Sequence, residues 1–536
     1  MKQYPLMRQI SREKAFLIVL ALPLLCSVIC AVLWSLRWPL VGDASLMHYV
    51  VFLMSKGKVL YDDIIDINMP GTYCFETFAM HLFGWSDLAW RIYDLVLLLL
   101  MGGAAMLIHR QRSLFAGLFA ATMFALIHMQ DGFAQTGQRD LVIAALLLCA
   151  YAALFAAQRG LRPGLLIFLF ALPMGATLTI KPTFLPLGVF LLLISARPMC
   201  RSDHQSDHQS NRRSDISLTQ HFGFGVTGLL LPPLCAVLWL HANRALAAFA
   251  EIVHTQIPLY AGLNRKPLSY LVAHLTSPIV VVCVLWLILL LFLRPKLTLE
   301  RIELLAGVGV AFLSYVAQGK GLPYHRYPFL ALLLVLMGMD LVEALGRPRI
   351  SQLIAAITLA FACLLLAPRA AWLVHSFTIS TPFEDALSTQ LSAFGPQLSG
   401  QVQCLDAFGG CINTLYDLRL VQSTGYLSDC YLFSTHPNPL TALYRADFWA
   451  AYQAARPKVI VVTDQFCFGD TSGFHKLDRW PELRDELARD YVQNAEWQPA
   501  TKERWWARSE YPPRYRIYVS KDSDWGNRPQ NIQLER

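Results

Sequence analysis

The chain has 536 residues, of which 55% are hydrophobic and only 15% are charged. Soluble domains carry about a quarter charged residues, so this composition excludes a disordered protein and an ordinary cytosolic enzyme. The net charge of +8 is spread over short loops, which is typical of a membrane protein and excludes a nucleic-acid-binding surface. We therefore expect a polytopic membrane protein with some soluble mass.

Long apolar runs fill the first two thirds of the chain. A bilayer core of about 30 Å needs roughly 20 apolar residues per helix, and this criterion predicts about 11 spans. They are residues 15–36, 91–109, 113–129, 140–157, 164–180, 183–196, 222–241, 272–293, 303–317, 328–345 and 352–370. The first lacks a small-x-small cleavage site and is too long for a signal peptide, so we interpret it as a retained signal anchor. The pair around Lys181 is short and interrupted by prolines, as re-entrant or broken helices are.

Basic loops predict the orientation of these spans, because Lys and Arg resist translocation. With a cytoplasmic N-terminus, the inside loops are all basic: Arg110–Arg112, Arg159–Arg162, Arg197–Arg213, Arg294–Lys296 and Arg347–Arg349. The outside segments are then 37–90, 130–139, the turn near Lys181, 242–271, 318–327 and everything after about 371.

The cytoplasmic segment 197–221 contains a repeated Ser-Asp-His-Gln sequence. Its histidines, His204 and His208, suggest metal binding. The low complexity of the segment favours a flexible, solvated linker instead.

Residues 371–536 are long enough to form one soluble domain. They contain an amphipathic helix at 447–456 and strand-like runs at 458–463 and 514–519. Helices mixed with short strands predict a small α/β domain.

Four cysteines of this tail fall in the proposed outside compartment: Cys404, Cys411, Cys430 and Cys467. An even number of cysteines in oxidising surroundings is compatible with disulfides. Cys404 and Cys411 are close enough in sequence to pair locally.

Three clusters of polar and ionisable residues lie at the outer ends of the spans, where such residues are default candidates for function. The first is in the loop 37–90 and includes Asp43, a few residues beyond the first span. An acidic residue there can accept a proton from an acceptor hydroxyl or amine. Alternatively, Asp43 caps a helix over 44–56, because Asp is a favoured N-cap. The two roles do not exclude each other.

The second cluster precedes the span 140–157 and contains Gln138, Arg139 and Asp140. One interpretation is that Asp140 caps the span and pairs with Arg139. The other is that the loop lines a sugar site with all three side chains.

The third cluster lies within 318–328 and contains Lys320, His325 and Arg326, with Lys181 on the same face. Positive charge is disfavoured on the outer side of a membrane, so these cations need a ligand. A lipid phosphate fits, because Arg offers a bidentate fork and Lys a point charge. Ordinary anionic headgroups are the alternative.

Several short motifs share one pattern: Gly42-Asp43, Gly57-x-x-Leu60-Tyr61-x-Asp63, Asp66-x-Asn68-x-Pro70-Gly71-x-Tyr73, Phe83-Gly84, Trp90-Arg91, Lys181-Pro182 and the segment 320–328. With this pattern, residues 10–370 resemble the GT-C superfamily of integral-membrane glycosyltransferases. More narrowly, they resemble the bacterial branch related to dolichyl-phosphate-mannose protein mannosyltransferases and lipid A aminoarabinose transferases.

The resemblance implies a helical GT-C-like membrane domain over 1–370 and a periplasmic α/β domain over 371–536. It implies that Asp43 is the catalytic base and that a second acid of the same loop helps to position donor or acceptor. Asp62, Asp63 and Asp66 are all candidates for this second role, and Asp63 and Asp66 are favoured. Gln138, Arg139, Asp140 and His325 are further positioning candidates. Many relatives have a Lys-Pro or Pro-Pro pair where this chain has Met69-Pro70. The donor phosphate would therefore be bound by Lys181, Lys320 and Arg326.

The reaction implied is inverting transfer of a sugar from a polyprenyl-phosphate donor to a glycolipid, polysaccharide or protein acceptor. It would take place on the periplasmic side of a bacterial inner membrane. We predict no cofactor and no metal, because no compact ligand set stands out. Membrane lipids are expected partners and nucleic acid is not.

Two other functions stay open. An O-antigen ligase or polymerase would depend on His325 and Arg326 and not on an acidic first loop. A lipid-linked substrate transporter or flippase predicts inverted repeats and ionisable residues near the middle of the membrane. No convincing repeat is present, and the clearest charges lie at span ends.

Overall fold

A computed structural model describes residues 4–196, 217–263, 265–347, 349–377, 382–407, 410–434, 439–464, 473–498 and 514–525. Most of the predicted linker, with its two histidines, and Cys467 lie outside these residues.

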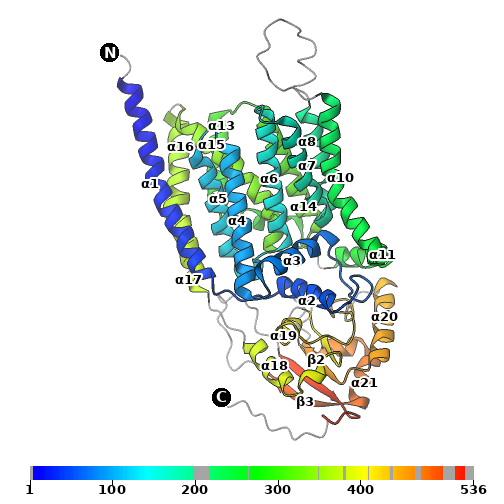
Figure 1. The fold of residues 1–536 in the computed structure, drawn as a ribbon. Coiled ribbons are helices and arrows are strands. Elements are labelled where there is room, and N and C mark those ends of the chain that lie inside the picture. Colours follow the sequence, from blue (N-terminus) through cyan, green and yellow to red (C-terminus); the bar gives the residue numbers. More distant parts are fainter. Residues whose placement is uncertain are drawn as a thin grey trace. The chain divides into compact units, whose positions relative to one another are not determined.

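The chain divides into two compact units (Figure 1). The first, here called the helical unit, comprises Met1–Trp38, Met69–Leu238 and Arg265–Ser376. The second, the sheet unit, comprises Pro39–Asn68, Trp239–Asn264 and Phe377–Arg536. The first half of the first outer loop therefore groups with the C-terminal residues.

The described part of the helical unit is built from helices α1 (Tyr4–Ser35), α3 (Pro70–Phe83), α4 (Asp87–His109), α5 (Leu114–Asp131), α6 (Arg139–Gln158), α7 (Pro163–Ile180), α8 (Leu185–Ser195), α10 (Leu218–Ala242), α12 (Leu268–Leu275), α13 (Val280–Leu293), α14 (Leu299–Gln318), α15 (Tyr327–Leu345), α16 (Arg349–Phe361) and α17 (Ala367–Ser376). A π-helix at Ala362–Leu366 joins the last two. The unit boundary at Leu238 falls within α10.

Eight helices of the described residues are long and apolar enough to cross a membrane, or nine if one bent pair counts as a single span. That pair is α12 and α13, which meet at 85°. The predicted count of about 11 is not confirmed. The predicted span 183–196 corresponds to an apolar helix too short for the criterion, at Pro182–Ser195. The prediction of a multi-pass helical membrane protein is confirmed.

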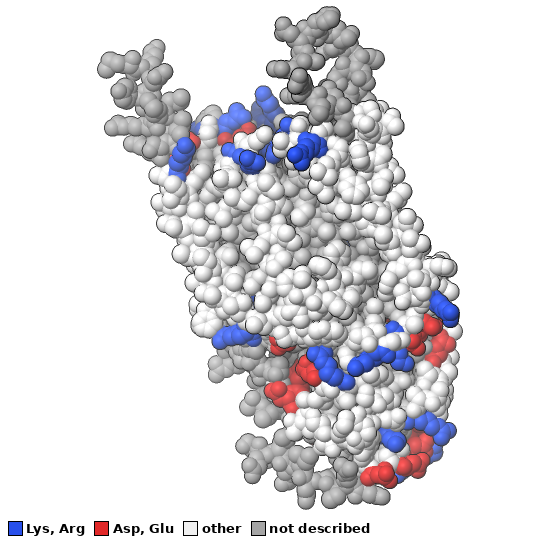
Figure 2. Space-filling model, viewed as in Figure 1, with Lys and Arg blue, Asp and Glu red and all other residues white. Residues whose placement is uncertain are grey.

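Helix α15 lies at the centre of the helical unit, where it contacts α5, α6, α14 and α16. Nearly all of its side chains are buried. Helix α1 pairs with α17 and leaves large apolar side chains exposed, such as Ile18, Leu22 and Leu33. Figure 2 shows a wide band across the middle of this unit without charged side chains, and Lys and Arg gathered at its upper end in this view. An apolar exposed band bounded by charges is the surface that a lipid bilayer requires.

The sheet unit contains a four-stranded sheet in the order β1-β2-β4-β3. The strands are β1 (Val402–Leu405), β2 (Val459–Thr463), β3 (Tyr491–Trp497) and β4 (Tyr515–Ser520). Strand β1 is parallel to β2, and the other two pairings are antiparallel. Its helices are α2 (Asp43–Ser55), α11 (Leu246–Gly262), α18 (Pro382–Ser392), α19 (Cys411–Asp417), α20 (Pro439–Ala455) and α21 (Pro481–Asp490). The predicted α/β tail is confirmed.

The burial of each strand follows its place in the sheet. All five residues of the central strand β2 are buried, as expected for a strand covered on both faces. Strand β4 alternates between buried and half-buried residues, and the residues of the edge strand β3 after Tyr491 are exposed or half-buried. The expected runs 458–463 and 514–519 match β2 and β4 within one residue.

Candidate functional site

Four loops at one end of the helical unit carry most of the predicted site residues. They are the segment between α5 and α6, the turn after α7, the segment before α12, and the connection from α14 to α15. Contacts between their side chains bring these loops together. The loops hold six cations against two carboxylates: Arg139, Lys181, Arg265, Lys266, Lys320 and Arg326 against Asp131 and Asp140.

Lys181, the residue directly after α7, pairs with a buried carboxylate. Its Nζ forms an ion pair with Asp140 and donates a hydrogen bond of 3.0 Å to Oε1 of Gln318. Burial lowers the pKa of Lys181, and the Asp140 carboxylate opposes that shift. The pair therefore joins the ends of α6, α7 and α14.

Arg326 is held by a second carboxylate. Its Nη2 donates to both oxygens of Asp131, at 2.7 and 2.8 Å. Its Nη1 donates to the backbone oxygens of His274, at 2.7 Å, and of Ser277. The side chain is 5% exposed. This guanidinium is thus already neutralised by a bidentate partner.

Arg139, Tyr324 and His325 lie beside these pairs. The Nη2 of Arg139 donates to the hydroxyl of Tyr324 at 3.1 Å, and its guanidinium lies 5.3 Å from the centre of that ring. The imidazole of His325 is 4% exposed and meets the Tyr324 ring edge-on at 4.6 Å. Arg139, Lys181 and Lys320 all act electrostatically on His325. Three cations of the cluster therefore act electrostatically on one buried imidazole.

Lys320 lies next to Arg265, a residue that the sequence interpretation did not single out. Burial, and to a smaller extent the positive charge of Arg265, lower the pKa of Lys320 to about 8. The backbone N–H of Lys266 donates to the oxygen of Gly319 at 2.7 Å, which fixes the two loops side by side. Arg265 itself is exposed, whereas Lys320 is 6% exposed. Two cations held this close favour an anionic ligand.

Several buried polar atoms of this cluster have no hydrogen-bond partner among the described residues. They are Oε1 of Gln135 and Gln138, Oδ2 of Asp140, Nδ1 of His325 and Nε of Arg326. Buried polar atoms without partners are costly, and each calls for an explanation such as a bound water or ligand. In the part of the chain that the structure describes, no group of three or more His, Cys, Asp or Glu side chains is arranged to hold a metal ion.

A buried network inside the membrane spans supports the α5–α6 segment, and sequence reasoning missed it. Asp94 of α4 forms an ion pair with Arg91, and its carboxylate contacts Nε2 of His128 at 3.0 and 3.2 Å. The same carboxylate accepts a hydrogen bond from Gly137. The sequence did contain a signal for this network, because Arg91, Asp94 and His128 lie within apolar spans. Ionisable residues in such spans mark functional positions.

Gly137 cannot be replaced by a larger residue without movement. Its φ is +58°, a conformation that favours glycine. A Cβ at this position would lie 2.1 Å from the ring of Trp90. The indole N–H of Trp90 donates to the oxygen of Thr136 at 3.2 Å. The backbone that leads into Gln138 and Arg139 is therefore fixed from α4.

The first-loop acids belong to the sheet unit. Asp43 is the first residue of α2, and the N-cap position is occupied by Gly42, with φ at +65°. Asp43 therefore lies in the first helical turn and is not the capping residue. A negative charge there is favourable at the positive end of the helix dipole.

Asp63 and Asp66 both support local turns. Oδ2 of Asp63 accepts from the backbone N–H of Val59 at 2.8 Å. Oδ1 of Asp66 accepts from the N–H of Asn68 at 2.7 Å, an Asx-type turn. The side chain of Asp66 is buried, whereas that of Asp63 is exposed.

The fold is similar to that of known membrane enzymes. No protein-family profile and no curated protein sequence matches the chain. The structure of ArnT from Cupriavidus metallidurans bound to undecaprenyl phosphate is similar, with a TM-score of 0.57 and 14% identity over 94% of this chain and 98% of that one. The oligosaccharyltransferase AglB from Archaeoglobus fulgidus, in complex with an inhibitory peptide and a dolichol-phosphate, gives a TM-score of 0.48 and 11% identity over 97% of this chain and 75% of that one.

The ArnT likeness extends over nearly the whole length of both chains. It therefore includes the helical unit and the sheet unit, each with the elements described above. The resemblance that the first-loop motifs suggested is confirmed at the level of the fold. The chain has the fold of the GT-C integral-membrane glycosyltransferases.

Proposed function

We propose that the protein transfers a sugar from a polyprenyl-phosphate donor to an acceptor. The observation that carries the proposal is the excess of cations among the four loops of the helical unit, six against two carboxylates. A fold similar to that of ArnT, whose structure holds undecaprenyl phosphate, supports a lipid phosphate as the anion. The acceptor is a glycolipid, a polysaccharide or a protein.

The proposed reaction is a single displacement at the anomeric carbon. The acceptor oxygen or nitrogen forms a bond to that carbon, and its proton passes to the carboxylate of Asp43. The bond between the anomeric carbon and the phosphate oxygen breaks, and the lipid phosphate leaves with the electron pair. One displacement inverts the anomeric centre. A phosphate leaving group needs no proton near neutral pH, so no general acid is required.

Lys320 and Arg265 are the proposed donor-phosphate cations. The pKa of Lys320 is already lowered by burial and by its neighbour, which an anion between them would relieve. Lys181 and Arg326 each have a carboxylate partner, so we assign them to shaping the pocket and adding to its positive field. Gln138, Asp140 and His325 are proposed to contact the sugar or the acceptor, because each has an unpartnered buried atom in this cluster. Arg139 is proposed to do the same, because it lies beside Tyr324 in the same cluster.

We propose that the cation cluster and the sheet unit face the periplasm of a bacterial inner membrane, with the N-terminus in the cytoplasm. The sheet unit holds a disulfide between Cys404 and Cys411, and disulfides persist in oxidising compartments. The loops between α4 and α5 and between α6 and α7 are basic, as cytoplasmic loops are. The sequence left the pairing of these cysteines open, and the structure joins the two that are close in sequence.

The test is transfer of radiolabelled sugar from a panel of polyprenyl-phosphate donors in membranes that contain the wild type, Asp43→Asn or Asp62→Asn. Asp62 is the matched control, because it is an exposed acid of the same loop. We expect transfer by the wild type and by Asp62→Asn, and loss of at least about 100-fold in Asp43→Asn, the usual size of a general-base contribution. Full transfer by Asp43→Asn would exclude Asp43 as the base. Absence of transfer by the wild type over the whole panel would contradict the proposed reaction.

A further inference from the structure

Helix α2, which begins with Asp43, is part of the compact unit that contains the C-terminal sheet. It packs against α19, a helix more than 350 residues further along the chain. Nine of its residues, Tyr49 and Phe52 among them, are buried. A helix that is apolar all round is stable only when protein or lipid encloses it.

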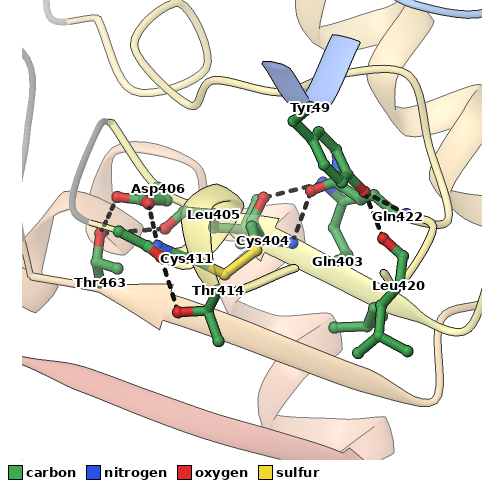
Figure 3. The surroundings of a disulfide bond; sticks show 12 residues. Tyr49, Gln403, Cys404, Leu405, Asp406, Cys411, Thr414, Leu420, Gln422 and Thr463 are labelled. Atoms are coloured by element: carbon green, nitrogen blue, oxygen red, sulfur yellow. Dashed lines mark hydrogen bonds between the residues drawn. A yellow bond between two sulfur atoms is a disulfide. The ribbon is translucent and has the colours of Figure 1, made fainter. Parts of the chain in front are cut away.

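The hydroxyl of Tyr49 ties α2 to the segment that follows α19 (Figure 3). It donates to the backbone oxygen of Leu420 at 3.1 Å and accepts from the backbone N–H of Gln422 at 2.7 Å. Tyr49 is fully buried, at 0% exposure. A phenol has one proton to donate, and here that proton goes to Leu420 while the phenol oxygen accepts from Gln422. The same segment therefore uses the hydroxyl both as donor and as acceptor.

Gln422 is itself bound to the disulfide segment. Its Oε1 accepts from the backbone N–H of Cys404 at 3.1 Å. The disulfide joins Cys404 in β1 to Cys411, the first residue of α19. The N–H of Cys411 donates to Oδ2 of Asp406 at 2.9 Å. The segment that bonds the Tyr49 hydroxyl is therefore itself bound to β1, at the residue that the disulfide joins to α19.

Helix α19 also contacts the residues just before α2 and the later turns of α2. Nδ2 of Asn413 donates to the backbone oxygen of Leu40 at 3.1 Å, three residues before Asp43. The ring of Tyr416 meets His48 edge-on at 5.6 Å and Phe52 at 6.5 Å. The helix is thus fixed just before its first turn, in its middle and in its last turns.

The rest of the loop is held in the same way. The N–H of Ile65 donates to the oxygen of Gly425 at 2.9 Å. A Cβ on Gly425 would lie 2.1 Å from the backbone oxygen of Asp63, so only glycine allows this close approach. The whole stretch from Leu40 to Ile65 is therefore built into the sheet unit.

We infer that α19 and the Cys404–Cys411 disulfide set the position of Asp43, with Tyr49 and Asn413 as positioning residues. The inference rests on the proposed role of Asp43 as base. A base acts only within hydrogen-bond reach of its proton, and a misplacement of about 1 Å costs about 100-fold in rate. The C-terminal domain is accordingly the scaffold of the catalytic loop, and Tyr49 acts on the reaction through the position of Asp43.

The first experiment compares Tyr49→Phe with Tyr452→Phe in the full-length protein. Tyr452 is the matched control, because it is also buried and its hydroxyl bonds Tyr491 within the same unit, 3.1 Å away. Hydrogen exchange of the peptide 43–55 and the kcat and KM of sugar transfer are measured for each. We expect Tyr49→Phe to speed exchange across α2 and to lower kcat at least about 10-fold with the donor KM unchanged. Tyr452→Phe is expected to do neither.

The second experiment removes the cross-link with the double variant Cys404→Ser/Cys411→Ser and uses Cys235→Ser, a free cysteine of α10, as its control. Asn413→Leu is a further variant of similar size that lacks the donor to Leu40. Exchange in β2 reports whether the domain is still folded in each variant. We expect the double variant and Asn413→Leu to reproduce the faster exchange in 43–55 and the lower kcat.

Two outcomes are decisive. Unchanged exchange and unchanged kcat in Tyr49→Phe, in a preparation where Asp43→Asn is inactive, would overturn the inference and leave the proposed function intact. Full activity of Asp43→Asn would overturn the proposed base, and exchange in 43–55 would still report whether α19 holds α2.

Discussion

The backbone N–H of Gly137 donates a hydrogen bond of 2.6 Å to Oδ1 of Asp94, which lies inside an apolar span. A carboxylate at membrane depth is costly unless it is paired. Asp94 is paired with Arg91 and His128, and Arg91 in turn donates to Oγ of Ser35 at 2.6 and 3.0 Å. The charge network of α4 thus ends on the backbone of the segment that carries Gln138.

We predict that Asp94→Asn lowers sugar transfer at least about 10-fold, because the segment before α6 loses its anchor. Asp340→Asn is the control: Asp340 is equally buried and bonds Arg301 and Trp286 on other helices. Both variants break a buried pair, so each is expected to lose about 3 kcal/mol or more of stability. Melting curves and transfer rates are measured together. Equal loss of transfer in the two variants would show that Asp94 has only a structural role.

The lowered pKa of Lys320 predicts a pH dependence of donor use. The ammonium is charged below its pKa of about 8 and neutral above it. Attraction of the donor phosphate is therefore complete at lower pH and is lost as the pH rises through about 8. We expect kcat/KM for the donor to fall as the pH rises through about 8, because this constant reports the titration of groups in the free enzyme.

Lys320→Arg should remove this fall, because a guanidinium stays charged throughout the range. Lys266→Arg, a neighbour in the adjoining loop, is the control and should keep it. An alkaline limb that is the same in Lys320→Arg and in the wild type would assign the titration to another group.

The bidentate pair of Asp131 and Arg326 predicts strong energetic coupling. Each single variant, Asp131→Asn or Arg326→Met, should lose about 3–5 kcal/mol of stability, because it leaves one charge buried without its partner. The double variant should lose less than the sum of the two, by about 1–3 kcal/mol. The stability of the wild type and of the three variants is measured by unfolding in detergent micelles. Additive losses would mean that the pair is not coupled.

Glu384 at the start of α18 predicts a pH dependence of stability in the sheet unit. Burial, together with the neighbouring carboxylates of Asp406, Asp385 and Asp417, raises its pKa to about 7. The folded state then binds more protons than the unfolded state between about pH 4.5 and pH 7, the unfolded and folded pKa values. Stability from this group is therefore full at low pH and falls as the pH rises through that window.

Glu384→Gln should flatten this dependence and melt higher than the wild type at pH 8, because the amide never ionises. Glu482→Gln, in the first turn of α21, is the control and should leave the dependence in place. Melting temperatures from pH 5 to pH 8 provide the comparison. A slope that Glu384→Gln leaves unchanged would exclude this carboxyl as its source.

The sequence predicted the features that depend on local pattern. Apolar runs identified the membrane spans, although their count failed where helices are short or bent, as at α8 and at α12 with α13. Strands β2 and β4 and helix α20 were found because buried strands and amphipathic helices have characteristic periods. The motifs of the first outer loop, together with Lys181-Pro182 and the segment 320–328, predicted the GT-C fold.

The candidate site was predicted only as separate segments. Asp140 and Lys181 were both named, but not their pairing, and Arg326 was named without Asp131 as its partner. Arg265 was missed, because a lone arginine in a loop has no pattern of its own. Its significance comes from Lys320, more than 50 residues away in the chain.

The sequence by itself therefore determined that this protein is a multi-pass membrane protein with an α/β tail, and which loops carry charge, because hydrophobicity and charge are properties of short segments. Only the tertiary structure decided which charges neutralise one another, and that residues 39–68 belong with the C-terminal sheet. Such contacts join residues hundreds of positions apart, as Tyr49 and Gln422 show. They depend on how whole elements pack, and a local pattern does not record that packing.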